Sequence, residues 1–560
     1  MTTANTPGTD KWLDALSWAT ILAFMASIAL GLLVPVYVDE VATKLVQARF
    51  LAEGGQMLSL FPQCASGFIL DTPLTWYPAA AVFSLLYGYL QPVGLRIAGI
   101  ATVLAWVAAF AGWVFLTIPA GRGRLRNLAG MAGILGLGVL PLTMGLARPE
   151  QWLVLLLTCY LTLAAGAGRL DSRGRAWTPA VLFAAFLLMT SLLNFVHPKA
   201  LFFLPFVIVA ACCVFGTRRK WLLGLAAAFA IVCAYQTFGF AQAVTRCEDA
   251  PILSGILGAQ TTKLSLAFSD PIGFVLEVSG NLAAAPGKIA EHGVFQSAYQ
   301  SAWLPPVPFA ASEAIVRAVN LGATGVWYLA CLLAALLPPL VFLRRPGPDG
   351  DGAGRFLIPA LWIGLLGHLA LYREWNFYGG AMVIAIAGLL LVHGLGRART
   401  LQRLPALGNL ALGSVLLLSL ASTAVLGVQQ GPRLLRAARS TDAVPANQEY
   451  SLNAFAYPGA RDRIRDLAEA CGLPGDGAVR LVVDDLGYFA FTDLRQPMHL
   501  GFLWPGGWGA DIAGKTRDLL VGMQSEGIIG RCSLIPPEFR HQTLREGDLC
   551  CVDLKDRRYF

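Results

Sequence analysis

Long apolar segments alternate with short polar ones along the first 430 residues of this 560-residue chain. A helix rises 1.5 Å per residue, so about 20 apolar residues are needed to cross a bilayer. About eleven segments meet this length, which predicts a polytopic α-helical membrane protein. The predicted spans are residues 13–36, 93–118, 128–146, 151–168, 178–196, 199–215, 221–239, 321–343, 356–372, 378–395 and 405–428.

The pattern changes over residues 431–560, where apolar runs shorten and hydrophobicity becomes periodic. The segment ARDRIRDLAEACG predicts an amphipathic helix that ends at Gly472, and VRLVVDD predicts a buried strand. The chain therefore divides into a transmembrane domain over residues 1–430 and a small α/β domain over 431–560. Two large loops, 38–92 and 240–320, belong to the first of these.

Charge sets the expected orientation in the membrane. The chain is 56% hydrophobic and 14% charged, with a formal net charge of +8 that resides mainly in short loops. With the N-terminus inside, all five basic loops lie on the cytoplasmic face, as the positive-inside rule requires. We expect a multi-pass protein of a bacterial inner membrane, with the C-terminal domain in the periplasm and no nucleic-acid partner. The five loops are residues 121–127, 169–177, 216–221, 344–355 and 396–403.

The same topology places the polar clusters on the outer face. The short apolar segment 77–90 is then expected at the outer interface and not as a span. Two adjacent carboxylates, Asp39 and Glu40, open the first outer loop. Glu40 can pair with Lys44 one helical turn later, whereas Asp39 has no such partner. A solvated helix end would explain both, but Asp39 could also accept a proton from an attacking sugar hydroxyl.

Further charged residues occur in three other outer segments. Arg148 and Glu150 begin one span, and His197 and Lys199 flank Pro198 in a tight turn. Each group has a structural explanation, such as a helix start or a surface ion pair. Together they bring cations suited to phosphate, and carboxylates, to one face. Arg373 and Glu374 form the remaining pair.

The sequence is compatible with several classes of function. A proton-coupled transporter places ionisable groups near the membrane midplane, whereas these spans are almost free of charge. No phosphate-binding loop or dinucleotide fingerprint occurs on the cytoplasmic side. A polysaccharide polymerase or ligase, a transporter or flippase of lipid-linked sugars, and a non-catalytic assembly subunit remain alternatives to a glycosyltransferase.

Short motifs in the transmembrane part resemble those of GT-C glycosyltransferases, which use polyprenyl-phosphate-linked sugars. Val38-Asp39-Glu40 resembles the acidic motif after the family's first helix, and Asp71–Tyr77 (DTPLTWY) is similar to the motif that ends its first loop. Arg96 matches the arginine that opens the next span. Arg148-Pro149-Glu150 resembles the second acidic motif of the family, close to the form found in cell-envelope arabinosyltransferases, and His197-Pro198-Lys199 is also similar to that branch. The C-terminal domain is similar to those of arabinose and aminoarabinose transferases.

The resemblance implies an inverting transfer of one sugar, such as arabinofuranose or a related pentose, from a polyprenyl-phosphate donor. The acceptor would be a glycan, lipid or protein of the cell envelope. Asp39 would be the catalytic base, and Arg148, His197, Lys199 and Arg373 would bind the donor phosphate. Glu40 and Glu150 would orient the acceptor or hold Mg²⁺, Mn²⁺ or Ca²⁺, which oxygen ligands suit.

Three further residues are lesser candidates. Arg96, Glu374 and His292 belong to this group, and His292 falls in a loop that could cover the site. The same loop contains Arg246, Glu248, Asp249 and Tyr299. In the C-terminal domain, one or two disulfides are expected in an oxidising compartment, with their connectivity open. The cysteines there are Cys471, Cys532, Cys550 and Cys551.

Overall fold

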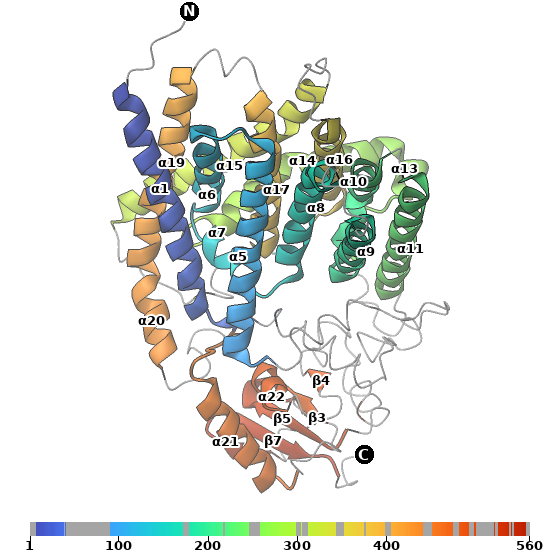
Figure 1. Ribbon diagram of the computed structural model, residues 1–560. Helices are drawn as coiled ribbons and strands as arrows, with labels where there is room; N and C mark the ends of the chain where they lie inside the picture. The colour runs from blue at the N-terminus through green and yellow to red at the C-terminus, as the bar shows by residue number, and fades with distance from the viewer. Residues whose placement is uncertain are drawn as a thin grey trace, which may run out of the picture.

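The protein is a helical bundle with a small sheet at one end (Figure 1). The computed structural model describes residues 7–37, 40, 90–171, 178–216, 219–245, 258–297, 304, 312–342, 352–373, 377–397, 405–440, 451–473, 481–491, 498–499, 520, 525–536, 539 and 543–555. The interface segment predicted at 77–90 therefore lies outside the described residues, except for Leu90.

Eight helical segments among the described residues are long and apolar enough to cross a membrane, and two shorter apolar helices accompany them. The prediction of a polytopic helical membrane protein is confirmed. The helices concerned are α1 (Pro7–Leu30) with η1 (Gly31–Leu33), α5 (Pro92–Thr117), α8 (Pro149–Asp171), α9 (Thr178–Val196), η3 (Pro198–Phe203) with α10 (Leu204–Phe215), α11 (Lys220–Thr245), α15 (Glu313–Phe342), α16 (Gly352–Leu371), α17 (Phe377–Arg397) and α19 (Pro405–Gln429) with α20 (Gly431–Arg439).

The predicted span 128–146 is not one continuous helix. It is divided into α6 (Arg122–Leu135) and α7 (Leu140–Met144). Gly138 between them has φ +58°, and a Cβ there would lie 1.9 Å from the carbonyl oxygen of Gly293. Only glycine fits this left-handed conformation and close approach. The count of eleven is therefore corrected to ten helical segments and one broken segment within the described chain.

The predicted loop 240–320 contains a helix, α14 (Pro271–Gly293), preceded by the single turn α13 (Leu266–Ser269). Asp270 caps α14 by accepting a hydrogen bond from the Gly273 N–H at 2.9 Å. The helix packs on α15, α16 and α17. Its last residue, Gly293, closes the contact with Gly138.

A five-stranded mixed sheet forms the C-terminal unit, with strand order β4-β3-β5-β7-β6. β4 and β5 run parallel to β3, and β7 runs antiparallel to β5 and β6. Gly472, with φ +77°, follows α21 (Tyr457–Ala470). The predicted helix and buried strand are confirmed as α21 and β3. The strands are β3 (Leu481–Val483), β4 (Met498–His499), β5 (Gly527–Arg531), β6 (Leu544–Glu546) and β7 (Leu549–Asp553), with α22 (Asp485–Ala490) after β3.

The C-terminal unit is tied to one end of the bundle, here called the sheet end. β1 (Val36–Tyr37), which follows the first helix, pairs antiparallel with β2 (Ser451–Leu452). One apolar cluster joins Ala147 and Phe195 of the bundle to Ile464 and Phe489 of the C-terminal unit. Residues at the start of α8 and the end of α9 therefore meet the C-terminal unit.

Two disulfides link the C-terminal unit, Cys471–Cys551 and Cys532–Cys550. Successive residues of a strand point to opposite faces, so the neighbours Cys550 and Cys551 reach different partners. Cys551 belongs to the apolar cluster on the α21 side, and Cys550 belongs to the cluster on the other face. The expected disulfides are confirmed, and the structure supplies their connectivity.

Removing the longer crosslink should destabilise the C-terminal unit. Cys471 and Cys551 are 80 residues apart, against 18 for the other pair. The chain-entropy estimate assigns about 4 kcal/mol to a loop of the longer length and about 3 kcal/mol to the shorter. We expect the double variant C471A/C551A to melt well below the wild type by circular dichroism, and C532A/C550A to fall between them. Equal melting temperatures for all three proteins would contradict this expectation.

Candidate functional site

A buried carboxylate lies at the centre of a charged cluster at the sheet end. Glu150, in the first turn of α8, is 1% exposed. Its Oε1 accepts a hydrogen bond from Lys199 Nζ at 2.8 Å, and His197 Nε2 lies 3.6 Å from the same oxygen. Arg148 Nε lies 3.6 Å from Oε2. We call these four residues the Glu150 cluster.

The turn between α9 and η3 places two of the members. Pro198 begins η3 with its fixed φ, and the Lys199 backbone N–H donates to His197 Nδ1 at 3.1 Å. Because Nδ1 accepts this bond, the proton of a neutral imidazole resides on Nε2, the atom near Glu150. The tight turn thus directs both side chains toward one carboxylate.

Two tyrosines cover the cationic side chains. The Arg148 guanidinium lies over the Tyr378 ring at 4.3 Å, and its Nη2 donates to the Tyr378 hydroxyl at 3.1 Å. Lys199 Nζ lies 5.1 Å from the centre of the Tyr372 ring. The His368 ring lies 5.3 Å from the Tyr372 ring, centre to centre. Cation–π contacts of this kind hold a desolvated cation in place.

Among the four residues of the cluster, positive charge exceeds negative charge. Burial and the Lys199 ammonium lower the pKa of His197 to about 3, so that imidazole is neutral at pH 7. Arg148 and Lys199 then contribute two positive charges against the single negative charge of Glu150. An unbalanced charge is costly in a buried site unless an anion completes it. The cluster is therefore suited to bind an anionic group.

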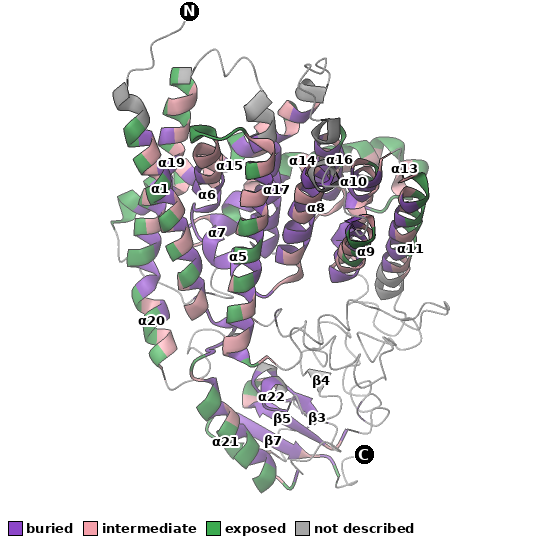
Figure 2. Cartoon of the chain, viewed as in Figure 1, coloured by how far each residue is buried: buried purple, intermediate pink, exposed green. Residues whose placement is uncertain are grey.

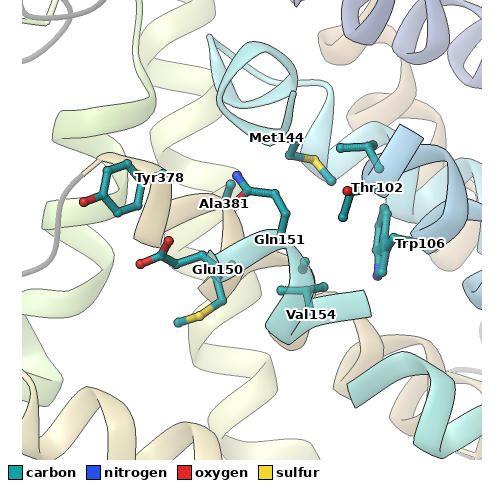
Figure 3. A pocket seen from close by; sticks show the side chains of 11 residues that line it. Thr102, Trp106, Met144, Glu150, Gln151, Val154, Tyr378 and Ala381 are labelled. Carbon is teal, nitrogen blue, oxygen red and sulfur yellow. The ribbon is translucent and has the colours of Figure 1, made fainter. Parts of the chain in front are cut away.

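A small cavity adjoins the cluster between α5, α8 and α17. Its volume is about 20 Å³, which is enough for one water molecule. Figure 3 shows Glu150 and Tyr378 on one side of the cavity and Thr102 and Trp106 on the other. Glu150 Oε2 and Gln151 Oε1 are buried without a hydrogen bond to a described residue. Both are acceptors that a water or an incoming hydroxyl could satisfy.

A second buried pair, Glu40 and Arg96, lies next to the Glu150 cluster. Arg96 Nη1 donates to Glu40 Oε1 at 2.8 Å, and Arg96 Nη2 bonds Oε2. The same carboxylate accepts the Tyr37 N–H at 2.9 Å and the Ala147 N–H at 2.6 Å. Arg96 Nη2 also donates to the Pro35 carbonyl at 2.9 Å. This pair, the Glu40 clamp, joins the start of the first loop to the residue before Arg148.

Arg373, two residues after the end of α16, belongs to a different group that is centred on Glu277 of α14. Its Nε donates to Glu277 Oε1 at 2.6 Å, and Thr262 Oγ1 donates to the same oxygen at 2.5 Å. Hydrogen bonds from Thr262 and Arg373 lower the pKa of Glu277 below its usual range. Lys288 Nζ bonds the Arg373 carbonyl. Arg373 directly follows Tyr372, so the two groups are neighbours along the chain.

The structure brings together Arg148, Glu150, His197 and Lys199, as the shared face predicted. Glu40 pairs with Arg96, where the sequence offered Lys44, which lies outside the described residues. His292, in the last turn of α14, is buried, and burial lowers its pKa to about 4. Asp39, Glu374, Arg246, Glu248, Asp249, Tyr299 and the segment 71–77 also lie outside the described residues.

Sequence reasoning missed the aromatic side of the site and one amide. Tyr372 and Tyr378 lie within the segment YREWNFYGG, which was selected for its charges alone. Aromatic residues next to a predicted cation site would have been the available signal. Gln151, directly after Glu150, and His368 gave no signal in their apolar helices.

The described carboxylates do not fit a divalent cation. Both oxygens of Glu40 accept hydrogen bonds from Arg96 and backbone N–H groups, and Glu150 is surrounded by nitrogen donors. A metal ion requires several oxygen ligands that are free to coordinate. Within the described chain, no group of three or more His, Cys, Asp and Glu residues could hold a metal ion.

Comparison with known proteins gives structural likeness only. No protein-family model matches the chain, and no curated protein does. It is similar to the Archaeoglobus fulgidus oligosaccharyltransferase tethered with an NVT-sequon acceptor peptide, with TM-score 0.41, 12% identity, and coverage of 93% of this chain and 69% of that one. For AglB of the same organism with an inhibitory peptide and a dolichol-phosphate, the TM-score is 0.40 and the identity is 12%, with coverage of 93% of this chain and 70% of that one. For the oligosaccharyltransferase complex with Zn and sulfate, the TM-score is 0.36 and the identity is 10%, with coverage of 91% of this chain and 68% of that one.

Proposed function

We propose that the protein is an inverting membrane glycosyltransferase that moves one sugar from a polyprenyl-phosphate donor to an acceptor of the cell envelope. The observation that carries this proposal is the Glu150 cluster, whose four residues carry two positive charges and one negative charge at the end of an apolar bundle. An anionic ligand with a lipid tail fits both the positive charge of the cluster and the apolar surroundings of the helices. The tail stays among the helices while the phosphate meets the cations.

The positive charge of the cluster suits the increase in negative charge on the phosphate during sugar transfer. A polyprenyl-phosphate sugar is a phosphodiester with one negative charge, and the polyprenyl phosphate that leaves gains a second. Preorganised cations stabilise charge that develops in the transition state more than charge already present in the substrate. Arg148 and Lys199 supply this stabilisation, and Tyr378 holds the guanidinium of Arg148 in position.

The reaction forms and breaks one bond at the anomeric carbon. The acceptor hydroxyl oxygen attacks that carbon from the side opposite the phosphate, and its proton passes to the carboxylate of Asp39. The bond between the anomeric carbon and the phosphate oxygen breaks, and its electron pair leaves with the phosphate. Direct displacement inverts the configuration at that carbon. The acceptor and the identity of the sugar, a pentose such as arabinofuranose in our proposal, follow from the motif resemblance.

The Glu40 clamp supports an assignment of Asp39 to the same site. Glu40 follows Asp39 in the chain, and its carboxylate bonds the Ala147 N–H directly before Arg148. This hydrogen bond links the start of the first loop to the Arg148-Pro149-Glu150 motif, which contains two residues of the Glu150 cluster. In this proposal the reaction takes place at the sheet end, on the periplasmic face of the inner membrane.

A transfer assay with the purified protein tests the proposal. The protein in detergent is given a panel of radiolabelled polyprenyl-phosphate sugars with a cell-envelope extract as acceptor. We expect one donor to be consumed, and we expect D39N to lower the rate about 10²- to 10⁴-fold because the general base is lost. The matched control is D14N, since Asp14 pairs with Arg122 at the opposite end of the bundle.

The outcomes separate the two parts of the proposal. Folded wild-type protein that consumes no donor with any acceptor would show that the enzyme assignment is wrong. Transfer that D39N retains in full would leave the enzyme assignment intact and refute the role of Asp39. A loss in D14N equal to that in D39N would mean that the effect of D39N is not specific.

A further inference from the structure

A basic helical extension continues one membrane span beyond the bilayer. α20 follows α19 through Gln430, whose N–H bonds the Leu426 carbonyl and whose carbonyl accepts from the Leu434 N–H, each at 2.9 Å. Helical hydrogen bonding thus continues across the junction. Figure 1 shows α20 prolonging α19 toward the sheet end. α20 has the sequence GPRLLRAAR and carries Arg433, Arg436 and Arg439.

Helix length places these arginines at the depth of lipid headgroups. The uninterrupted apolar part of α19 begins near Leu410, and about 20 residues from there span the hydrocarbon core. This count reaches Gln429 and Gln430, two adjacent polar residues. Arg433, Arg436 and Arg439 then lie roughly 5, 9 and 14 Å beyond the core along the axis, at 1.5 Å per residue. Long arginine side chains can reach back toward the headgroups.

Two of the arginines lie on or near the side of the helix that faces lipid. Leu410, Leu417, Val428 and Leu435 are exposed large apolar residues of α19 and α20. Their spacings of seven and eleven residues place them within about 20° of one line along the helix. Arg439 lies eleven residues after Val428 and therefore continues that line. Arg436 is displaced from Val428 by about 80°, and both arginines are exposed. Figure 2 shows exposed positions along α20.

The protein does not neutralise these two charges within the described chain. The Arg436 side chain donates from Nε to the Pro432 carbonyl of its own helix at 3.3 Å. Neither Arg436 nor Arg439 forms an ion pair with a described carboxylate. Arg317, at the same end of the bundle, does pair with Glu313. The two guanidinium groups are therefore available to anions outside the protein.

We propose that Arg436 and Arg439 form a binding surface for the phosphate headgroups of anionic phospholipids in the leaflet at the sheet end. A continuous lipid-facing stripe that ends in exposed guanidinium groups matches the shape of a phospholipid, with acyl chains along α19 and the phosphate at α20. Arginine binds phosphate oxygens with two parallel N–H groups. This surface is separate from the Glu150 cluster and is independent of the proposed transfer reaction.

Native mass spectrometry can test the surface on the full chain. The protein is reconstituted in nanodiscs with equal amounts of phosphatidylcholine and phosphatidylglycerol, and the lipids retained after release are counted. We expect the wild type to retain phosphatidylglycerol at least fivefold over phosphatidylcholine, since a basic residue at an anionic surface contributes about fivefold in affinity. R436Q/R439Q should reduce this ratio to near one, and R317Q should keep it.

Two results would overturn the proposal. One is a ratio in R436Q/R439Q equal to that of the wild type. The other comes from adding polyprenyl phosphate to the wild type. If this displaces phosphatidylglycerol, and if R436Q/R439Q also loses polyprenyl phosphate binding, then the arginines belong to the donor site and not to a phospholipid surface.

Discussion

Replacing Arg96 with methionine is expected to destabilise the sheet end of the bundle by about 3–5 kcal/mol, the usual cost of leaving one partner of a buried ion pair alone. Arg96 is 1% exposed and Glu40 is fully buried. Methionine keeps much of the apolar volume but provides no charge and no donor. The Glu40 carboxylate would keep the Tyr37 and Ala147 N–H groups and lose all its contacts with the guanidinium.

A thermal assay with a thiol-reactive fluorescent dye can measure this loss, in a background where every free cysteine except Cys233 is replaced by serine, since Cys212 is exposed in the folded protein. Cys233 is buried in α11, belongs to the apolar cluster that joins the bundle to the C-terminal unit, and reacts only after that cluster opens. We expect R96M to react several degrees below the wild type. The matched control is R122M, because Arg122 is half exposed and pairs with Asp14 at the surface, where ion pairs contribute little. Equal melting of R96M and the wild type would show that the clamp is not structural.

The double variant E40Q/R96M separates the charge from the hydrogen bonds. Glutamine removes the unpaired charge and keeps one carbonyl oxygen that can accept from the Tyr37 or Ala147 N–H. We expect part of the stability to return, because an uncompensated buried charge costs more than one missing hydrogen bond. No recovery at all would mean that the guanidinium acts through its bond to the Pro35 carbonyl and its packing.

The Glu40 clamp also shows where prediction from the sequence reached its limit. A local rule offered Lys44, four residues after Glu40, as the partner. The observed partner is 56 residues away, and the backbone N–H that completes the site is 107 residues away. Such pairings depend on how α5 and α8 pack, which periodicity along one helix does not encode.

Hydropathy identified most of the membrane spans. It did not predict a helix break that depends on backbone conformation. Residues 128–146 are as apolar as their neighbours, yet Gly138 turns the chain between α6 and α7 against the end of α14. Length and composition measure whether a segment tolerates lipid. They are insensitive to a contact between two backbones. The helix α14 was not predicted, and its apolar residues lie both against the bundle and on the exposed surface, so they do not mark a single apolar face.

Four of the candidate residues form the charged cluster, whereas Arg373 pairs with Glu277, and the arrangement of the cluster was not predicted. Topology alone placed Arg148, Glu150, His197 and Lys199 on one face. It did not indicate that Glu150 would lie at the centre, or that burial would leave His197 neutral. These properties arise from the turn at Pro198 and from the burial of the cluster, which depend on packing between helices and not on the order of residues in one segment.

Replacing Lys199 with methionine should lower the turnover number for sugar transfer about 10²- to 10³-fold, the usual effect of removing one donor that stabilises developing charge. The side chain is 3% exposed, and its loss changes the net charge of the Glu150 cluster from one positive charge to zero. Lys199→Arg restores the charge and should recover part of the rate. The control K555M removes a lysine from an exposed pair with Glu526 in the C-terminal unit and should keep the wild-type rate.

A purely structural role for Lys199 would also lower the rate, so the decisive measurement is a comparison of two affinities. Polyprenyl phosphate, the product, carries one more negative charge than the donor. If Lys199 stabilises the charge that develops on the phosphate, K199M should lose more affinity for polyprenyl phosphate than for the intact donor. A variant that is merely misfolded loses both in proportion, because it has fewer competent molecules. Proportional losses would therefore assign Lys199 to holding Glu150 in place, and a larger loss for the product would assign it to the leaving phosphate.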